Sequence, residues 1–247
     1  MATVRVRPRS PVAGVCGFYY FCNAVEAAVE ASETKSEALI SQNLLINERN
    51  RYLLFNIKMP QPEPEAGNLL VAEPFLRESF FNHAVVCLID CPRGESAMGL
   101  VMNKPSEYTL GEVLDSVPEP LAGIRVMCGG PVDENRLFYL HTMQPMFPGS
   151  ERVCGDLFIG GDFDSVVDYV GSGMPVDGRL QFYLGYSGWE PLQLQEEIDR
   201  NVWAVTGMDN PGRMLGWPAG KMWHRQVAMM GPAYRGWLYH PQYPMMN

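Results

Sequence analysis

After residue 67, short apolar runs separated by turn residues predict a series of β-strands. The run FFNHAVVCLID at 80–90 is rich in β-branched residues, which favour the pleated backbone of a strand. The residues CPRGE at 91–95 fit a hairpin loop between two neighbouring strands. The predicted strands cover residues 68–74, 80–90, 96–104, 124–132, 136–142, 157–161 and 179–186.

Three other stretches have apolar residues at helical spacing, and they predict helices over 109–117, 162–173 and 191–203. Thr109 and Glu112 form the T-x-x-E pattern of a capping box at the start of the first helix. Asp162 or Asp164 suits the start of the second, and Gly171 suits its end. Regular βαβ alternation is absent, so we predict an α+β fold with a mostly antiparallel or mixed sheet and a few peripheral helices.

Charge divides the chain unevenly and bears on its partners. Residues 1–58 carry seven Lys/Arg and five Asp/Glu, whereas residues 59–247 carry twelve and twenty-three, a net charge of −11. Binding to a phosphate backbone requires clustered Lys and Arg, so direct nucleic-acid binding is not expected of this acidic body. No apolar run reaches the roughly 20 residues needed to span a bilayer, so no membrane association is expected either.

Residues 1–58 are expected to lie outside the folded domain, for one of two reasons. The stretch RVRPRS precedes an apolar run and resembles the start of a targeting segment. Alternatively, Met59 is the true start, because the Pro/Glu-rich stretch PQPEPEAG follows it at once. We favour Met59. We expect residues 1–58 to be disordered or a wrongly assigned start, 59–66 to be a linker, and 67–247 to be a single domain.

The sequence GYSGW at 185–189 comes nearest to a catalytic motif. The nucleophile elbow G-x-S-x-G needs a glycine two residues before and two residues after the serine. Here the second glycine comes one place early, and a tryptophan occupies its position. We therefore predict a strand-to-helix turn, with Ser187 and Glu190 forming a capping box, or with Glu190 as the cap and Pro191 as the first helical residue. No catalytic residue is predicted.

Two further stretches carry groups that catalysis or binding could use. IGGDFD at 159–164 joins a strand to a helix through glycines, but two carboxylates stand where a phosphate would bind, which favours helix capping. Cys128 and His141 fall in different predicted strands, so we expect a core thiol and a hydrogen-bonded strand histidine. The histidines and cysteines show neither H-x3-H nor C-x2-C spacing, and no metal or cofactor is predicted.

Four motifs in order resemble the YqgE/AlgH family of bacterial proteins. They are GNLLVAEPFLRESFFNHAVVCLID at 67–90, GLVMNKPSEYTLGEVL at 99–114, GGPVDENRLFYLH at 129–141 and GYSGWEPLQLQEEIDRNVW at 185–203. They resemble the family's opening strand, its Gly-Leu-Val-Leu-Asn-Arg-Pro segment, its Gly-Gly-Pro-Val turn and its Gly-x-x-Gly-Trp stretch. The resemblance covers about residues 67–206. Leu192 and Gln195 depart from it, because the family usually has Gly and Glu there.

The resemblance implies a compact cytoplasmic protein whose strands fold into a barrel-like sheet. Some members carry the label of transcriptional regulator, but the acidic body, which lacks a recognisable basic helix, argues against direct DNA binding here. The resemblance brings no agreed catalytic residues. We therefore expect a non-enzymatic binding or regulatory protein of unknown ligand. The alternative is an enzyme, a hydrolase or a thiol-based one, with a pocket near the turn Gly129–Pro131.

Two turns are candidates for the functional surface. Residues 103–105 and 129–131 both follow apolar strands and both end at a proline, which stops a strand or helix before it. Paired glycines let another group approach closely. We predict that the two turns lie beside residues 185–189 and bind a small molecule or a protein partner; the alternative is that they are purely structural. The candidate residues are Asn103, Gly129, Gly130, Pro131, His141, Gly185, Gly188 and Trp189.

Overall fold

The computed structural model describes residues 61–239, apart from residues 77, 79, 116 and 145. The expectations for residues 1–58 lie outside this range. The described residues form a ten-stranded sheet. Its strands are β1 (Leu69–Ala72), β2 (Val85–Asp90), β3 (Ala97–Val101), β4 (Pro105–Thr109), β5 (Arg125–Cys128), β6 (Val132–His141), β7 (Glu151–Cys154), β8 (Leu157–Ile159), β9 (Leu180–Trp189) and β10 (Trp203–Thr206).

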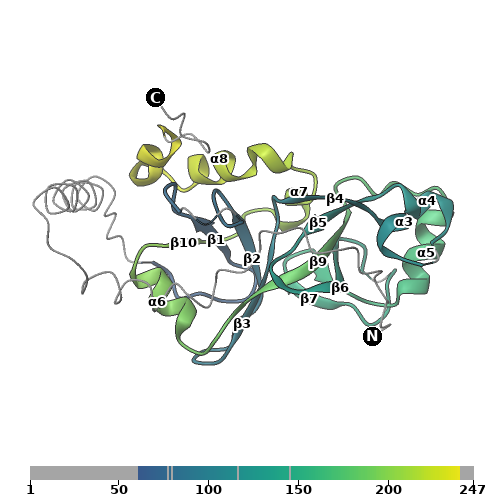
Figure 1. The fold of residues 1–247 in the computed structure, drawn as a ribbon, viewed down its shortest axis with the longest axis horizontal. Helices are drawn as coiled ribbons and strands as arrows, with labels where there is room; N and C mark the ends of the chain where they lie inside the picture. The colour runs from purple at the N-terminus through teal and green to yellow at the C-terminus, as the bar shows by residue number, and fades with distance from the viewer. Residues whose placement is uncertain (1–60, 77, 79, 116, 145, 240–247) are drawn as a thin grey trace, which may run out of the picture. The chain divides into compact units, whose positions relative to one another are not determined.

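The sheet curls into a half-barrel (Figure 1). Its strand order is β10-β1-β2-β3-β9-β6-β8-β7, and β5 joins it by pairing with β9 and with β4. Every pair is antiparallel except β5 with β9. At the β7 edge the strand returns toward the residues before β1, where the Cys154 thiol lies 3.8 Å from the carbonyl oxygen of Gly67. The α+β prediction with a mostly antiparallel, barrel-like sheet is confirmed.

Strand β9 is shared by the two halves of the sheet. Its end at Ser187–Trp189 pairs with β3, and the rest pairs with β6 and β5. Gly185 sits between these parts with φ +67, a left-handed conformation that glycine adopts without steric penalty. The predicted turn at 185–189 is therefore wrong, because β3 continues the ladder through Gly188 to Trp189.

Helices cover parts of the sheet and follow its last strand. They are α3 (Leu110–Val113), α4 (Glu119–Ala122), α5 (Phe163–Gly171), α6 (Gln193–Asp199), α7 (Pro211–Met214), α8 (Ala219–Met229) and the 3-10 helix η2 (Pro232–Tyr239). Helix α8 lies near β1 and β10, whereas α3, α4 and α5 cluster at the opposite end of the described domain (Figure 1). None of the helices in the described part of the chain is both long and apolar enough to cross a membrane.

The helix starts predicted at Thr109 and at Asp162 are confirmed. The backbone N–H of Thr109 donates to the Glu112 carboxylate at 2.9 Å, completing a capping box. Asp162 accepts from the backbone N–H of Ser165 at 3.0 Å. The first helix ends sooner than predicted, because Leu114 is already extended, with φ −109 and ψ 137.

The helix predicted over 191–203 spans only α6, and its predicted caps are wrong. The chain enters α6 through Leu192 in a left-handed conformation, with φ 69, and the Gln193 side chain accepts from the Glu190 backbone N–H at 3.0 Å. Ser187 takes no part in capping. Trp203 instead begins β10, where it pairs with Ala72 of β1. Strands β4, β7 and β10 and the helices after residue 210 were not predicted.

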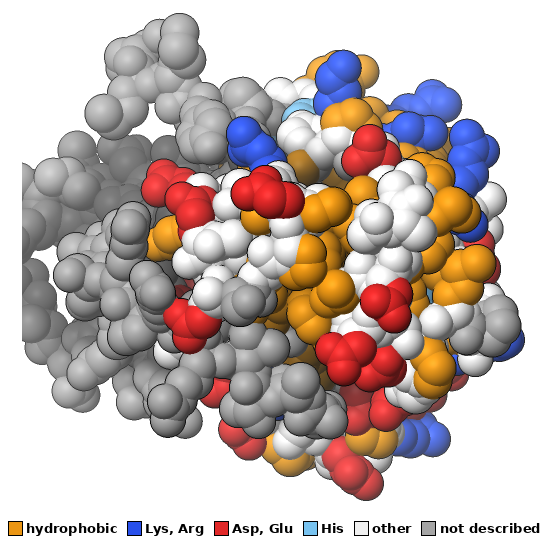
Figure 2. Space-filling view, turned by 90° about the vertical axis from the view of Figure 1, so that its right-hand side faces the viewer, with side chains coloured by type: hydrophobic (Ala, Val, Ile, Leu, Met, Phe, Trp, Pro, Cys, Tyr) orange, Lys and Arg blue, Asp and Glu red, His pale blue; other side chains and the backbone are white. Residues whose placement is uncertain are grey.

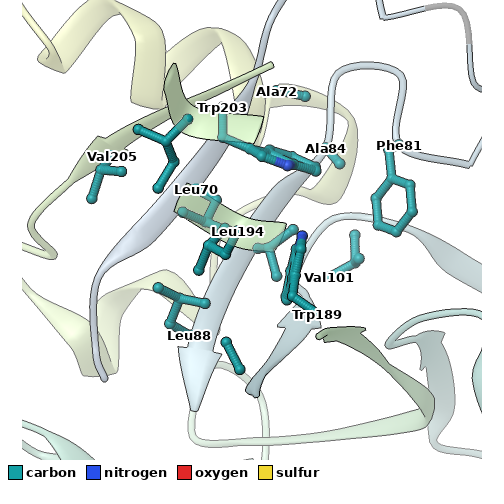
Figure 3. Packing of buried hydrophobic residues seen from close by; sticks show 13 residues of the cluster. Leu70, Ala72, Phe81, Ala84, Leu88, Val101, Trp189, Leu194, Trp203 and Val205 are labelled. Atoms are coloured by element: carbon teal, nitrogen blue, oxygen red, sulfur yellow. The ribbon is translucent and has the colours of Figure 1, made fainter. Parts of the chain in front are cut away.

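Alternating strand residues fill two faces of the sheet. On one face the side chains of β1, β2 and β3 pack under α6, and Leu70, Leu194 and Trp203 lie in the middle of this cluster (Figure 3). The next residues along the strands, such as Leu69, are equally buried on the other face. A separate cluster lies beneath α3, α4 and α5. The sequences of β1 and β2 are therefore continuous apolar runs, because both faces of these strands are covered.

Candidate functional site

The three turn segments singled out in the sequence lie side by side around β9. The Gly129 N–H donates to the Leu184 carbonyl at 2.7 Å, and the Gly129 carbonyl accepts from the Val101 N–H at 2.8 Å. The Ser187 hydroxyl also reaches this carbonyl, at 3.3 Å. Gly129, the residue after β5, thus bonds to both β3 and β9. The predicted juxtaposition is present, whereas a ligand-binding role for it remains a prediction.

The paired glycines allow backbone to pack directly on backbone. A Cβ atom at Gly130 would overlap the main chain of Tyr186 and Ser187, and one at Gly129 would overlap the carbonyl of Gly185. Both positions are buried. The Gly-Gly sequence is therefore required by the crossing of two strands at contact distance, because any side chain would force them apart. Pro131 follows, half-buried, immediately before β6.

Asn103 holds the neighbouring loop in place. Its side-chain amide donates to the His83 carbonyl at 2.8 Å and accepts from the Val85 N–H at 2.9 Å, and the residue is buried. The adjacent Lys104 ammonium donates to the Asn82 carbonyl at 2.6 Å. The Asn-Lys-Pro turn therefore directs its polar atoms at the start of β2.

His141 lies apart from these segments. It pairs with Leu180, at the far end of β9 from Gly185, which at about 3.3 Å per residue is roughly 16 Å away. One ring nitrogen lies 3.0 Å from the Gly160 carbonyl, and the other accepts from the Met143 N–H at 3.1 Å. Burial lowers the pKa of the imidazole, which favours the neutral form. His141 is a hydrogen-bonded strand histidine, as the sequence indicated.

Cys128 is half-buried beside the Gly129 turn. Its backbone N–H donates to the Lys104 carbonyl at 2.7 Å. Burial and then the nearby Glu134 raise the pKa of the thiol, and the Lys104 ammonium opposes this only in part. A raised pKa keeps the sulfur protonated near neutral pH and makes it a poor nucleophile. Because Cys128 pairs with Leu184 and His141 with Leu180, the two do not form a catalytic dyad.

Glu197 is the centre of a polar cluster that the sequence reasoning missed. One carboxylate oxygen accepts from both indole nitrogens, at 2.9 Å from Trp189 and 2.7 Å from Trp203, and the other accepts from the Gln193 amide at 2.9 Å. Both tryptophans are buried. The sequence contained a signal for this cluster. Glu197 lies three residues after Leu194, on the same side of the helix, and between Trp189 and Trp203 in the sequence.

This Glu197 cluster explains the fourth sequence motif in structural terms. Trp189, the last residue of β9, pairs with Ala97 of β3, and its indole donates to Glu197. Near the cluster, burial and then the Glu197 charge raise the pKa of Glu78. Among the residues that the structure describes, no group of three or more His, Cys, Asp or Glu side chains is arranged to hold a metal ion.

These features define a class of protein, an α+β half-barrel in which β9 belongs to both halves of one sheet. Gly129, Gly130 and Gly185 allow the close backbone contact where the strands cross. The chain belongs to the AlgH-like family, whose model matches residues 69–235. The suspected family is thereby confirmed.

Relatives and solved structures agree with this assignment. A UPF0301 protein of Bacteroides fragilis is 36% identical over 194 residues, covering 78% of this chain and 97% of the relative. A UPF0301 protein of Cytophaga hutchinsonii is 30% identical, covering 73% and 98%. The solution structure of the AlgH protein from Pseudomonas aeruginosa matches with a TM-score of 0.57 and 28% identity, covering 70% of this chain and 94% of that one. The crystal structure of DIP2367 from Corynebacterium diphtheriae, with a TM-score of 0.59 and 21% identity over 76% and 97% of the two chains, shares the fold.

Proposed function

We propose that this protein is a non-enzymatic, cytoplasmic binding or regulatory protein, whose motifs build a scaffold and whose partner contacts lie on its surface. One observation carries the proposal: the polar side chains of the motifs bond within the fold. Asn103 bonds two backbone groups, Ser187 bonds the Gly129 carbonyl, and Glu197 accepts from three side chains. A catalytic group must instead present its reacting atom to a substrate.

The partner expected on these grounds is a protein or a small molecule. Direct nucleic-acid binding is not proposed, because residues 59–247 carry a net charge of −11. A regulatory role through a protein contact is compatible with the label that some family members carry.

A specific observation favours a second candidate, a thiol-based enzyme. Cys128 is half-exposed next to the Gly129–Pro131 turn, and the Lys104 ammonium is close enough to act on its charge. A cation beside a thiol is one way in which a nucleophilic cysteine is activated. The raised pKa of Cys128 opposes this candidate, so the scaffold function is preferred.

Reactive probes separate the two functions. The full chain is treated with a fluorophosphonate and, separately, with iodoacetamide, both folded and unfolded in urea. We expect no labelling of Ser187, and slower alkylation of Cys128 in the folded protein than in the unfolded one. Ser187→Ala and Cys128→Ser are the controls that assign the labelled residue. Fluorophosphonate on Ser187, or faster alkylation of Cys128 in the folded protein, would replace the scaffold function with an enzyme.

A further inference from the structure

Acidic residues predominate at the end of the domain that carries α3, α4 and α5, with the exposed Arg125 and Arg179 following the two acidic segments in the sequence. Residues 107–124 and 162–177 together contain eight Asp and Glu and no Lys or Arg. All eight side chains are exposed. We call this surface the acidic face. Its acidic residues are Glu107, Glu112, Asp115, Glu119, Asp162, Asp164, Asp168 and Asp177.

The acidic face also exposes apolar side chains. Met174 is 44% exposed, and Pro118, Pro120 and Pro175 on the same two segments are exposed as well. Figure 2, which looks at the side carrying these helices, shows hydrophobic side chains lying between groups of acidic ones, with Lys and Arg side chains along the upper and right-hand margins. An apolar centre within a polar rim is a common composition of a protein-docking site, in which the apolar centre supplies affinity and the rim supplies orientation.

The complementary charge lies on the C-terminal segment of the same domain, whose helix α8 lies away from α3, α4 and α5 and whose Gly216 packs against Gly178. Residues 211–239 contain four Lys and Arg and no Asp or Glu. All four, Arg213, Lys221, Arg225 and Arg235, are exposed. We call this surface, on α7, α8 and η2, the basic face.

Helix α8 turns its cations away from the sheet. Its inward side is held by the Trp223 indole, which donates to the Ala72 carbonyl at 2.9 Å, and by the buried Met222 and Val227. Lys221 and Arg225, one helical turn apart, therefore share the outer side. Exposed apolar groups accompany them, since Met229 is 46% and Tyr239 84% exposed. Each face thus offers charge around apolar surface, with opposite sign.

We infer that the acidic face of one copy of this protein docks the basic face of a second copy. Two different patches meet in such a contact, so the assembly is head-to-tail, and it grows as a chain of copies or closes as a ring. Opposite charges steer the encounter and set the register, whereas like faces repel each other. The inference rests on the proposed binding function and names its partner. The chain itself supplies the complement of its acidic face, which favours a second copy over a foreign basic segment.

Sedimentation velocity of the full chain over a range of concentrations tests the contact. We expect association in about 20 mM NaCl that is lost in about 500 mM NaCl, because salt screens exposed charges. Lys221→Glu with Arg225→Glu reverses the basic face, and Asp168→Lys with Asp177→Lys reverses the acidic face. Each double variant alone should associate at least about tenfold more weakly than the wild type. Circular dichroism checks that each variant is folded.

Mixing the two variants gives the sharper result. The intact acidic face of one variant meets the intact basic face of the other, so association should return in the mixture. Glu95→Lys with Glu190→Lys, exposed positions outside both faces, is the matched control and should associate like the wild type. Association that ignores both reversals would overturn the inference.

A wild type that stays monomeric in low salt would also overturn the inference of head-to-tail association. A second titration then tests the proposed binding function separately. A labelled Lys/Arg-rich amphipathic peptide is added to the monomer. If the peptide binds the wild type but not the Asp168→Lys, Asp177→Lys variant, the partner of the acidic face is a foreign basic segment. The proposed binding function then stands. The reactive probes described above, not this experiment, decide whether the protein is an enzyme.

Discussion

Two regions of this molecule use carboxylates in opposite ways. At the Glu197 cluster, one side chain accepts three hydrogen bonds and ties α6 to β9 and β10. On the acidic face, eight carboxylates are exposed within two segments that contain no cation. The first region is built from a motif of the family, whereas most residues of the second, all except Glu107 and Glu112, lie outside the motifs.

The difference indicates where fold and partner contact are encoded. Residues that the family motifs share bond to one another and to the main chain, so changing them should alter stability. Residues of the acidic face are exposed, so changing those other than the helix caps Glu112 and Asp162 should alter association while stability hardly moves. Substitutions in the two regions should therefore affect different measurements, and four predictions follow from that contrast.

The largest expected effect is that of Gly130→Ala. The added methyl group would overlap the backbone of Tyr186 and Ser187, which belongs to the shared strand and cannot yield as a side chain would. We expect a loss of about 3 kcal/mol or more in the free energy of unfolding. Gly171→Ala is the control on the acidic face, where a Cβ meets nothing within 4 Å. Urea denaturation measures both, and equal stability of the two variants would break the comparison.

Glu197→Ala should cost somewhat less. Two buried indole N–H groups would lose their acceptor, at about 1–3 kcal/mol for each unsatisfied group, and we expect a total of about 2–3 kcal/mol. Asp168→Ala on the acidic face should stay within about 0.5 kcal/mol. Chemical denaturation with tryptophan fluorescence reports on both. A cost below about 1 kcal/mol for Glu197→Ala would mean that water replaces the carboxylate.

His141 should make stability depend on pH. Burial lowers its pKa in the folded protein, so the unfolded chain binds the proton first as the pH falls. Its contribution is full above about pH 6.5, the ordinary value, and is lost as the pH falls toward the folded pKa. Urea midpoints measured from pH 8 to pH 5 should fall less steeply for His141→Gln than for the wild type. The exposed His224→Gln is the control, and identical slopes for all three proteins would contradict the prediction.

Leu192→Gly should have the smallest effect and the opposite sign. Leu192 has φ 69, is 63% exposed, and stands where the family usually has glycine. Relief of the left-handed strain, partly offset by the freer unfolded chain, should stabilise the protein by about 0.5–1 kcal/mol. Gln195→Gly, in the exposed interior of α6, should destabilise it by about 1 kcal/mol. Thermal unfolding in which both variants lose stability would refute a strained entry to α6.

Local patterns in the sequence were sufficient for much of the fold. Alternation and β-branched residues located β2, β3 and β9, and the capping residues Thr109 and Asp162 marked two helix starts. The sequence also predicted that the Gly129 turn and the Asn103 loop lie together, because both follow apolar strands and both end at a proline. Each of these signals depends on a few neighbouring residues, so it can be recognised without knowing the tertiary structure.

The failures came from long-range pairing. Gly188 resembled a turn residue, but in β9 it is a strand residue that pairs with Met98 of β3. Trp203 continued a helical pattern, but pairing with Ala72 of β1 makes it the start of β10. Likewise, Glu197 acquires its role only when Trp189 and Trp203 are brought to it by two different strands.

The pairing of β1 with β10 also sets a condition on how the chain is synthesised. Leu69, at the start of β1, pairs with Thr206, at the end of the last strand, so the two ends of the sheet's sequence meet. A ribosome adding 5–20 residues per second needs on the order of 10 s between them. During that interval β1 and β2 can form a hairpin, but the apolar side chains that α6 and β10 later cover stay exposed to water. The nascent chain therefore exposes these apolar side chains before β10 can pair with β1. Chaperones that bind apolar segments should bind it during that interval.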